Sequence, residues 1–128
     1  MNKLIIDAAN EKIFLMIITS SHIYNITNEN TKNNYEKLTK IISDFLISFN
    51  LKIGDINSIY INKGPGSFAG IRNSLSIVKA FNVAKKIDYY CYSLDDFKDE
   101  TDLSYKNIPN LCDKFKIKKN LINPIYIS

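Results

Sequence analysis

Glycines are concentrated in one short segment of this chain. Three of the four glycines, Gly64, Gly66 and Gly70, fall within seven residues, with Pro65 among them. Glycine permits a positive φ and a close approach of two backbones, and proline restricts its own φ. Ser67 is a residue type that caps the first free N–H groups of a helix. The segment therefore predicts a rigid turn from a strand into a helix, a junction found in α/β folds.

An anion-binding role is the alternative for this turn, because the free N–H groups at a helix N-terminus bind phosphate. The spacing fits neither common phosphate loop. A Walker loop needs Lys and then Ser or Thr after its last glycine, whereas Ile71 and Arg72 follow Gly70. The glycine intervals also differ from Gly-x-Gly-x-x-Gly. A structural turn is favoured, and a residual nucleotide site formed by Asp7 and the Gly64 to Gly70 loop is kept as the alternative.

Hydrophobic periodicity predicts one α/β domain. Three apolar runs separated by short polar turns predict a meander of antiparallel strands, and later apolar residues at helical spacing predict amphipathic helices. Further strands alternate with these helices, which indicates a mixed sheet that carries helices, and Ser93 is the expected N-cap of a third helix. Strands are expected at 3–7, 13–19, 22–27, 56–62 and 89–92, and the first two helices at 35–50 and 68–86.

The periodicity fades after about residue 98. Five acidic residues lie within 95–102 and four lysines within 114–119, so this part of the chain is expected to be polar and weakly determined. Ile122, Ile125 and Ile127 are expected to form a final short strand.

Composition narrows the classes of protein. The longest apolar run, 13–18, is too short to cross a bilayer, and no secretory signal precedes it, so a cytoplasmic protein is expected. Cys91 and Cys112 are too few for a disulfide framework and are expected to stay reduced. His22 is the one histidine, with no His or Cys at ligand spacing, so no metal site is expected. The net charge of +4 is carried almost entirely by lysine, which predicts a solvated surface rather than a dedicated phosphate-binding face.

Arg72 is the single arginine among the 17 basic residues. A cation in the first turns of a helix opposes the positive end of the helix dipole, so a guanidinium there suggests a specific need for its planar fork. A bidentate pair with a carboxylate is predicted, with Asp7 and Glu36 as the candidate partners. A solvated Arg72 is the alternative.

The nine residues from Gly64 to Arg72 read Gly-Pro-Gly-Ser-Phe-Ala-Gly-Ile-Arg. They resemble the Gly-Pro-Gly-Ser-Phe-Thr-Gly-Leu-Arg signature of the TsaB (YeaZ) family of bacterial tRNA-modification proteins. The apolar segment ending in Asp7, the pair Glu36 and Leu38, and 124–127 are also similar to family segments. Two departures are visible: Asp-Thr-Ser of the family is Asp7-Ala8-Ala9 here, and Asn34 stands at a family histidine.

The resemblance implies a single ribonuclease H-like lobe of the actin-like ATPase superfamily. Family members are longer and have a second lobe of the same ancestry. Residues 1–97 are therefore expected to be the first lobe, and 98–128 a short polar tail with a terminal strand in place of the second. A nucleotide cleft between two lobes is not expected in such a chain.

The resemblance also implies a noncatalytic scaffold. It would bind TsaD, which is joined by TsaE and transfers a threonylcarbamoyl group to N6 of adenosine 37 in tRNA. No cofactor is expected in this chain, and tRNA would be met through the complex. Whether TsaE recruitment survives, and whether the chain forms a homodimer when alone, are left open.

Family dimers pair through the two helices of the first lobe, and both helices here carry more apolar surface than one sheet face requires. The partner interface is predicted to comprise Tyr35, Leu38, Ile42, Phe45, Ile71, Leu75, Val78 and Ala84. The alternative is that all of them are core residues. A third class of function, a small basic RNA-binding module, would use Lys114, Lys116, Lys118 and Lys119 with Phe115.

Overall fold

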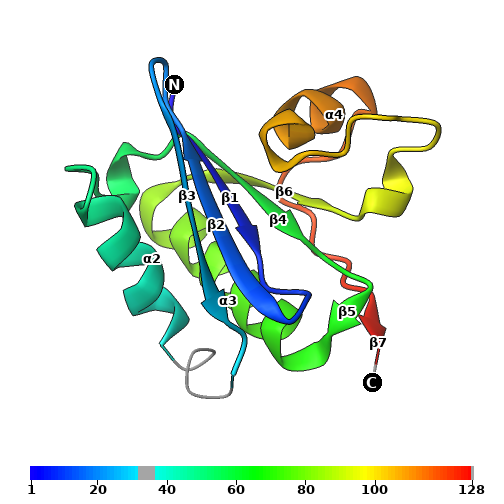
Figure 1. Ribbon diagram of the computed structural model, residues 1–128, viewed down its shortest axis with the longest axis horizontal. Helices are drawn as coiled ribbons and strands as arrows, with labels where there is room; N and C mark the ends of the chain where they lie inside the picture. The colour runs from blue at the N-terminus through cyan, green and yellow to red at the C-terminus, as the bar shows by residue number, and fades with distance from the viewer. Residues whose placement is uncertain (32–36, 128) are drawn as a thin grey trace.

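A five-stranded mixed sheet forms the centre of the computed structural model, which describes residues 1–31 and 37–127 (Figure 1). The strand order is β3-β2-β1-β4-β6; β1–β2 and β2–β3 are antiparallel, while β1–β4 and β4–β6 are parallel. The predicted meander, the mixed sheet and the α/β class are confirmed. The strands are β1 (Lys3–Asp7), β2 (Lys12–Ile18), β3 (Ile23–Glu29), β4 (Ser58–Asn62) and β6 (Asp88–Tyr92).

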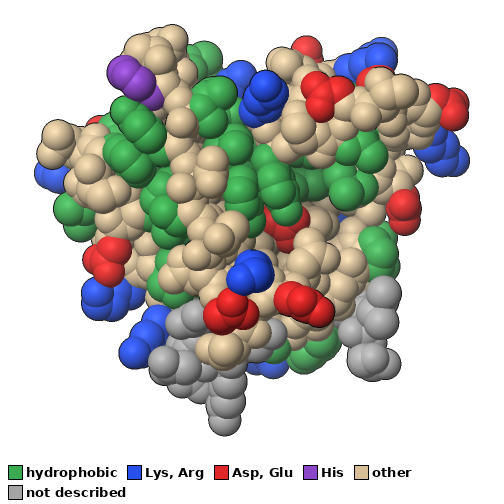
Figure 2. Space-filling model, in the orientation of Figure 1, with side chains coloured by type: hydrophobic (Ala, Val, Ile, Leu, Met, Phe, Trp, Pro, Cys, Tyr) green, Lys and Arg blue, Asp and Glu red, His purple; other side chains and the backbone are tan. Residues whose placement is uncertain are grey.

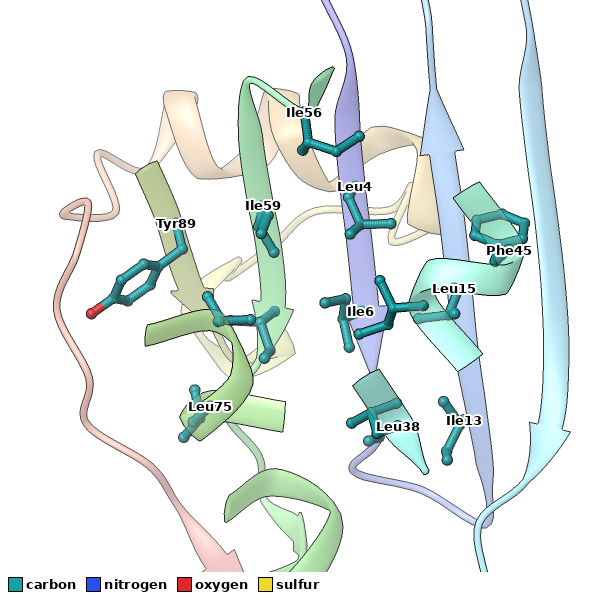
Figure 3. Packing of buried hydrophobic residues seen from close by; sticks show 14 of the residues in the cluster. Leu4, Ile6, Ile13, Leu15, Leu38, Phe45, Ile56, Ile59, Leu75 and Tyr89 are labelled. Carbon is teal, nitrogen blue, oxygen red and sulfur yellow. The ribbon is translucent and has the colours of Figure 1, made fainter. Parts of the chain in front are cut away.

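Two helices, α2 (Leu38–Ile47) and α3 (Phe68–Lys85), cover one face of this sheet (Figure 1). Alternation along β1 directs Leu4 and Ile6 toward these helices. The main core lies between the two layers, where Figure 3 shows strand residues packed against Leu38, Phe45 and Leu75. The start of the first predicted helix, with Asn34, Tyr35 and Glu36, lies outside the described residues.

The opposite face of the sheet is partly covered by α4 (Ile108–Lys114), which lies within the segment expected to be a polar tail. Ile108, Leu111 and Cys112 are buried in a second cluster with Ile5 and Tyr60. The expectation of a weakly determined tail is therefore wrong for this segment. Figure 2 shows hydrophobic side chains gathered in a band over the sheet beside α4.

The remaining elements are short. The predicted third helix after Ser93 is a single turn, η2 (Leu94–Asp96), in which the side chains of Ser93 and Asp96 form a capping box. The predicted last strand is β7 (Tyr126–Ile127), which pairs in parallel with β5 (Gly66–Ser67) beside the glycine-rich turn. Two further single turns are η1 (Ile53–Asp55) and η3 (Tyr105–Asn107).

Most of the predicted partner interface lies inside the molecule. Six of its residues are buried in the main core, so the structure corrects the expectation that their side chains face a partner: Leu38, Ile42, Phe45, Ile71, Leu75 and Val78. Ala84 is exposed on α3, and Tyr35 lies outside the described residues. The helices do present other apolar side chains outward, including Ile47 and Val83. In the described part of the chain no helix has the length and apolar character to span a membrane.

Candidate functional site at the end of the first strand

Asp7 ends β1 at the centre of the sheet and is only 3% exposed. Its Oδ1 accepts a hydrogen bond from the Ala9 N–H at 3.0 Å. Its Oδ2 accepts hydrogen bonds from Asn62 Nδ2 at 3.1 Å and from the Tyr105 hydroxyl at 2.8 Å, and Asn10 Nδ2 lies 3.5 Å away. These donors come from different segments, so the buried carboxylate joins the ends of β1 and β4 to the C-terminal part of the chain.

Three N–H groups of the glycine-rich turn donate hydrogen bonds within the chain. The N–H of Gly64 donates to Asn62 Oδ1 at 2.9 Å, and that of Ser67 donates to the Ala9 carbonyl at 2.9 Å. The N–H of Gly70 donates to Ser67 Oγ at 3.3 Å, so Ser67 is the N-cap of α3, as predicted. Because these three donors are already used within the chain, the geometry favours a structural turn over an anion-binding loop.

The turn needs glycine for two physical reasons. Gly64 has φ of 112°, a conformation that L side chains rarely adopt, and it precedes a cis peptide bond to Pro65. A Cβ at Gly66 or Gly70 would collide with the backbone carbonyl oxygen of Ala9 or Ala8, respectively. The turn is thus packed directly against the backbone that follows Asp7.

Arg72 does not pair with Asp7, so that prediction is wrong. Asp7 lies on the sheet face that carries Ile5 and Phe14, whereas Arg72 is on α3, which covers the other face. The Arg72 guanidinium is exposed and lies 5.9 Å from the centroid of the Phe68 ring. The other candidate partner, Glu36, is outside the described residues.

Tyr105 completes the site, and no pattern in the sequence pointed to it. Its ring stacks on Phe14 with centroids 3.8 Å apart, and its hydroxyl reaches Asp7. Burial and the nearby Asp7 carboxylate raise the pKa of Tyr105, so the hydroxyl stays a hydrogen-bond donor. Asn62 was not predicted either, although a polar residue at the end of a strand, two positions before the first signature glycine, is a signal that the sequence contains.

An open cleft of about 820 Å³ lies beside this network. Asp7 does not line it, and Lys12, which does, is paired with Glu29. Among the described residues, no group of three His, Cys, Asp or Glu side chains is placed to hold a metal ion. A nucleotide that used Asp7 would first have to displace the Tyr105 hydroxyl. The cleft is lined by Ala9, Asn10, Glu11, Lys12, Phe14, Thr27, Asn30, Ser67 and Tyr105.

The two thiols are suited to packing rather than to nucleophilic chemistry. Burial raises the pKa of Cys91 and of Cys112 to about 12 in each case.

A folded-state thiol pKa above the unfolded value of 9.0 stabilises the fold below pH 9, and this contribution is lost as the pH rises toward 12. We expect urea denaturation to show a falling free energy of unfolding over this range. Rapid thiol alkylation of the folded chain near neutral pH, or constant stability up to pH 12, would contradict this assignment.

Comparison with known proteins defines the class of fold. The structure of YeaZ from Pseudomonas aeruginosa superposes with a TM-score of 0.66 at 17% identity, covering 72% of this chain and 43% of YeaZ. A RuvC structure from T. thermophilus, in complex with a Holliday junction substrate, gives a TM-score of 0.54 at 11% identity, covering 98% of this chain and 85% of RuvC. The fold is the ribonuclease H-like α/β fold shared by these proteins.

The family follows from sequence comparison. A family model described as "TsaD: tRNA N6-adenosine threonylcarbamoyltransferase" matches residues 20–93, more than half of the chain. A Buchnera aphidicola (subsp. Schizaphis graminum) protein named "tRNA threonylcarbamoyladenosine biosynthesis protein TsaB" is 26% identical over 87 residues, which are 68% of this chain and 41% of that protein. The chain belongs to this family, in its TsaB/YeaZ branch. It spans about two fifths of the length of that curated relative.

Proposed function

We propose that this protein is a noncatalytic scaffold subunit that binds TsaD and supports threonylcarbamoyl transfer to N6 of adenosine 37 in tRNA, in the cytoplasm. The observation that carries the proposal is that the polar groups at the end of β1 and in the glycine-rich turn are already hydrogen-bonded within the chain. Asp7 is buried and fully hydrogen-bonded, and three N–H groups of the turn are used within the chain. A site arranged in this way stabilises a lobe, and the chemistry is assigned to TsaD.

The outer surface of α2 and α3 is the proposed contact with TsaD. A groove of about 250 Å³ runs between these helices and η1, and its lining is mostly apolar. Ile47 is 60% exposed and Val83 73% exposed on the same two helices. The groove is lined by Thr39, Ile42, Ser43, Leu46, Ile47, Lys52, Ile53 and Phe81.

The kind of occupant is suggested by the family match. Because the TsaD family model matches residues 20–93, a TsaD protein has a stretch that corresponds to α2 and α3. Two related lobes would then meet helix pair to helix pair, with apolar side chains from both sides filling the grooves. TsaE and tRNA would join through the resulting complex.

A charge placed on this surface is expected to prevent assembly. Val83→Glu and Ile47→Glu would bury an unpaired carboxylate in the proposed interface, so each should reduce co-purification with the TsaD of the same organism at least tenfold. Both side chains are exposed in the lone chain, so its melting temperature should change little. Co-expression followed by size-exclusion chromatography is the measurement.

Leu103→Glu is the matched control, because Leu103 is also exposed and apolar but precedes η3 on the other side of the sheet. Equal co-purification of all three variants with TsaD would rule out the helix surface. If the unmodified chain stays alone when TsaD is present, the scaffold proposal itself is wrong. A homodimer that is lost with Val83→Glu would show the same surface used between two copies.

A further inference from the structure

A small pocket of about 170 Å³ lies where β4 and β6 end. Ligands of open α/β sheets bind at the carboxyl ends of parallel strands. The segment that follows α4 passes this edge on its way to β7 (Figure 1). The pocket is lined by Lys63, Cys91, Asp96, Lys116, Ile117, Lys118, Leu121 and Asn123.

Lys63 is the fixed element of this pocket. Its N–H donates to the Tyr92 carbonyl at 2.8 Å, and its own carbonyl accepts from the Ile125 N–H at 2.8 Å, so its backbone is held on both sides. Its side chain is only 11% exposed. The ammonium donates to Asn123 Oδ1 at 3.2 Å, a neutral acceptor. The cation is thus positioned before any ligand arrives.

The positive charge of the Lys63 ammonium has one carboxylate nearby, and that carboxylate is not in close contact. Asp96 Oδ2 lies 3.8 Å from the ammonium, at the limit of an ion pair. That same oxygen accepts a hydrogen bond from the Ser93 N–H at 2.9 Å, within the capping box of η2. A largely buried ammonium with one distant, shared carboxylate is stabilised by a further anion.

The structure divides the tail lysines into two kinds. Lys114 forms an ion pair with Glu100, and Lys119 lies 3.6 Å from Asp88. Lys116 and Lys118 line the pocket, and in the described part of the chain neither is within ion-pair distance of a carboxylate. The residues that line the pocket therefore include three lysines and one carboxylate, that of Asp96.

We propose that Lys63, Lys116 and Lys118 form a binding site for a backbone phosphate of RNA. Ammonium groups are good donors to phosphate oxygens, and most of the affinity of proteins for nucleic acid comes from such contacts. A pocket of this volume is smaller than the sites that enclose nucleotides and other small molecules, which favours one phosphate of a polymer. The choice of RNA as the source rests on the proposed role in tRNA modification.

Binding of unmodified tRNA to the lone chain tests the site, with fluorescence anisotropy measured over a series of salt concentrations. The double substitution Lys116→Gln, Lys118→Gln is expected to weaken binding about tenfold at low salt. It should also lower the slope of log K against log salt by up to about one, as expected for the loss of one phosphate contact. Lys79→Gln, Lys85→Gln is the control, because it removes the same charge from exposed positions on α3. Equal weakening by both double substitutions, or by neither, would overturn the proposal.

Inorganic phosphate is the second probe. In ¹H–¹⁵N spectra of the unmodified chain, phosphate is expected to shift the amide signals of Lys63, Asp96 and Asn123, and Lys63→Gln should abolish these shifts. Shifts in the amide signals of lysines all over the surface would instead indicate nonspecific binding and would refute the proposed site. TsaD co-purification of the Lys116→Gln, Lys118→Gln chain separates the two proposals: retained TsaD binding with unchanged tRNA affinity refutes only the phosphate site.

Discussion

Asp7→Ala is expected to lower the free energy of unfolding by about 3 kcal/mol or more. The substitution removes an acceptor that is 3% exposed and leaves the Ala9 N–H, Asn62 Nδ2 and the Tyr105 hydroxyl without their partner. Each unsatisfied buried donor costs about 1–3 kcal/mol, and partial hydration relieves some of that cost. Urea denaturation measures the change, and the melting temperature should fall by roughly 10 °C.

Asp44→Ala is the control for this substitution. Asp44 also pairs with a partner, Lys40, but both side chains are largely exposed on α2, so the change should stay within about 0.5 kcal/mol. Tyr105→Phe removes only one of the hydrogen bonds to Asp7 and should cost about 1–2 kcal/mol. If Asp7→Ala were as stable as the unmodified chain but lost binding of ATP with Mg²⁺, the nucleotide-site alternative would replace the structural role.

Gly70→Ala is expected to destabilise the protein by about 2–3 kcal/mol. The sign of the change in stability is informative, because helix propensity alone predicts that the free energy of unfolding rises by about 1 kcal/mol when alanine replaces glycine inside a helix. Gly70 is in the first turn of α3, and a Cβ there would collide with the backbone carbonyl oxygen of Ala8. Ala8 directly follows Asp7, whose carboxylate is fixed by three segments, so the backbone cannot withdraw without loss of that network.

Gly54→Ala is the matched control, since a Cβ at Gly54 would meet no atom within 4 Å. Its stability should differ from that of the unmodified chain by less than about 0.5 kcal/mol. The comparison uses the same chemical change at two glycines and therefore isolates close packing. Equal stability of both variants, measured by urea denaturation, would show that the turn does not press against the end of β1.

Most of the sheet and both long helices could be predicted from the sequence. The strands of the meander are joined by short polar turns, and α3 begins at the capping residue Ser67 and carries apolar residues at helical spacing. The glycine-rich turn was also predictable, since glycine and proline followed by a helix-capping serine are typical of a turn that leads into a helix. These features are encoded by residues close together in the chain.

The sequence was less informative where contacts between residues far apart in the chain determine the structure. Periodicity showed that α2 and α3 have apolar faces, but it could not show that the sheet covers Leu38 and Leu75 completely. A helix of seven residues such as α4 is too short for periodicity to identify. The pair of Arg72 with Asp7 could have been excluded from the sequence, because alternation along β1 places Asp7 on the face of Ile5, away from α3.

The hydrogen bond from Tyr105 to Asp7 joins residues 98 positions apart, which has a consequence for the order of folding. Closing so long a loop is slow, whereas the hairpins of β1, β2 and β3 need only local contacts. The arm that carries Tyr105 should dock after the sheet has formed and detach first during partial opening. During such openings the carboxylate of Asp7 would lose the Tyr105 hydroxyl and keep the hydrogen bonds from the Ala9 N–H and Asn62 Nδ2. A protein that binds the partly open chain would therefore meet a different surface from one that binds the finished fold.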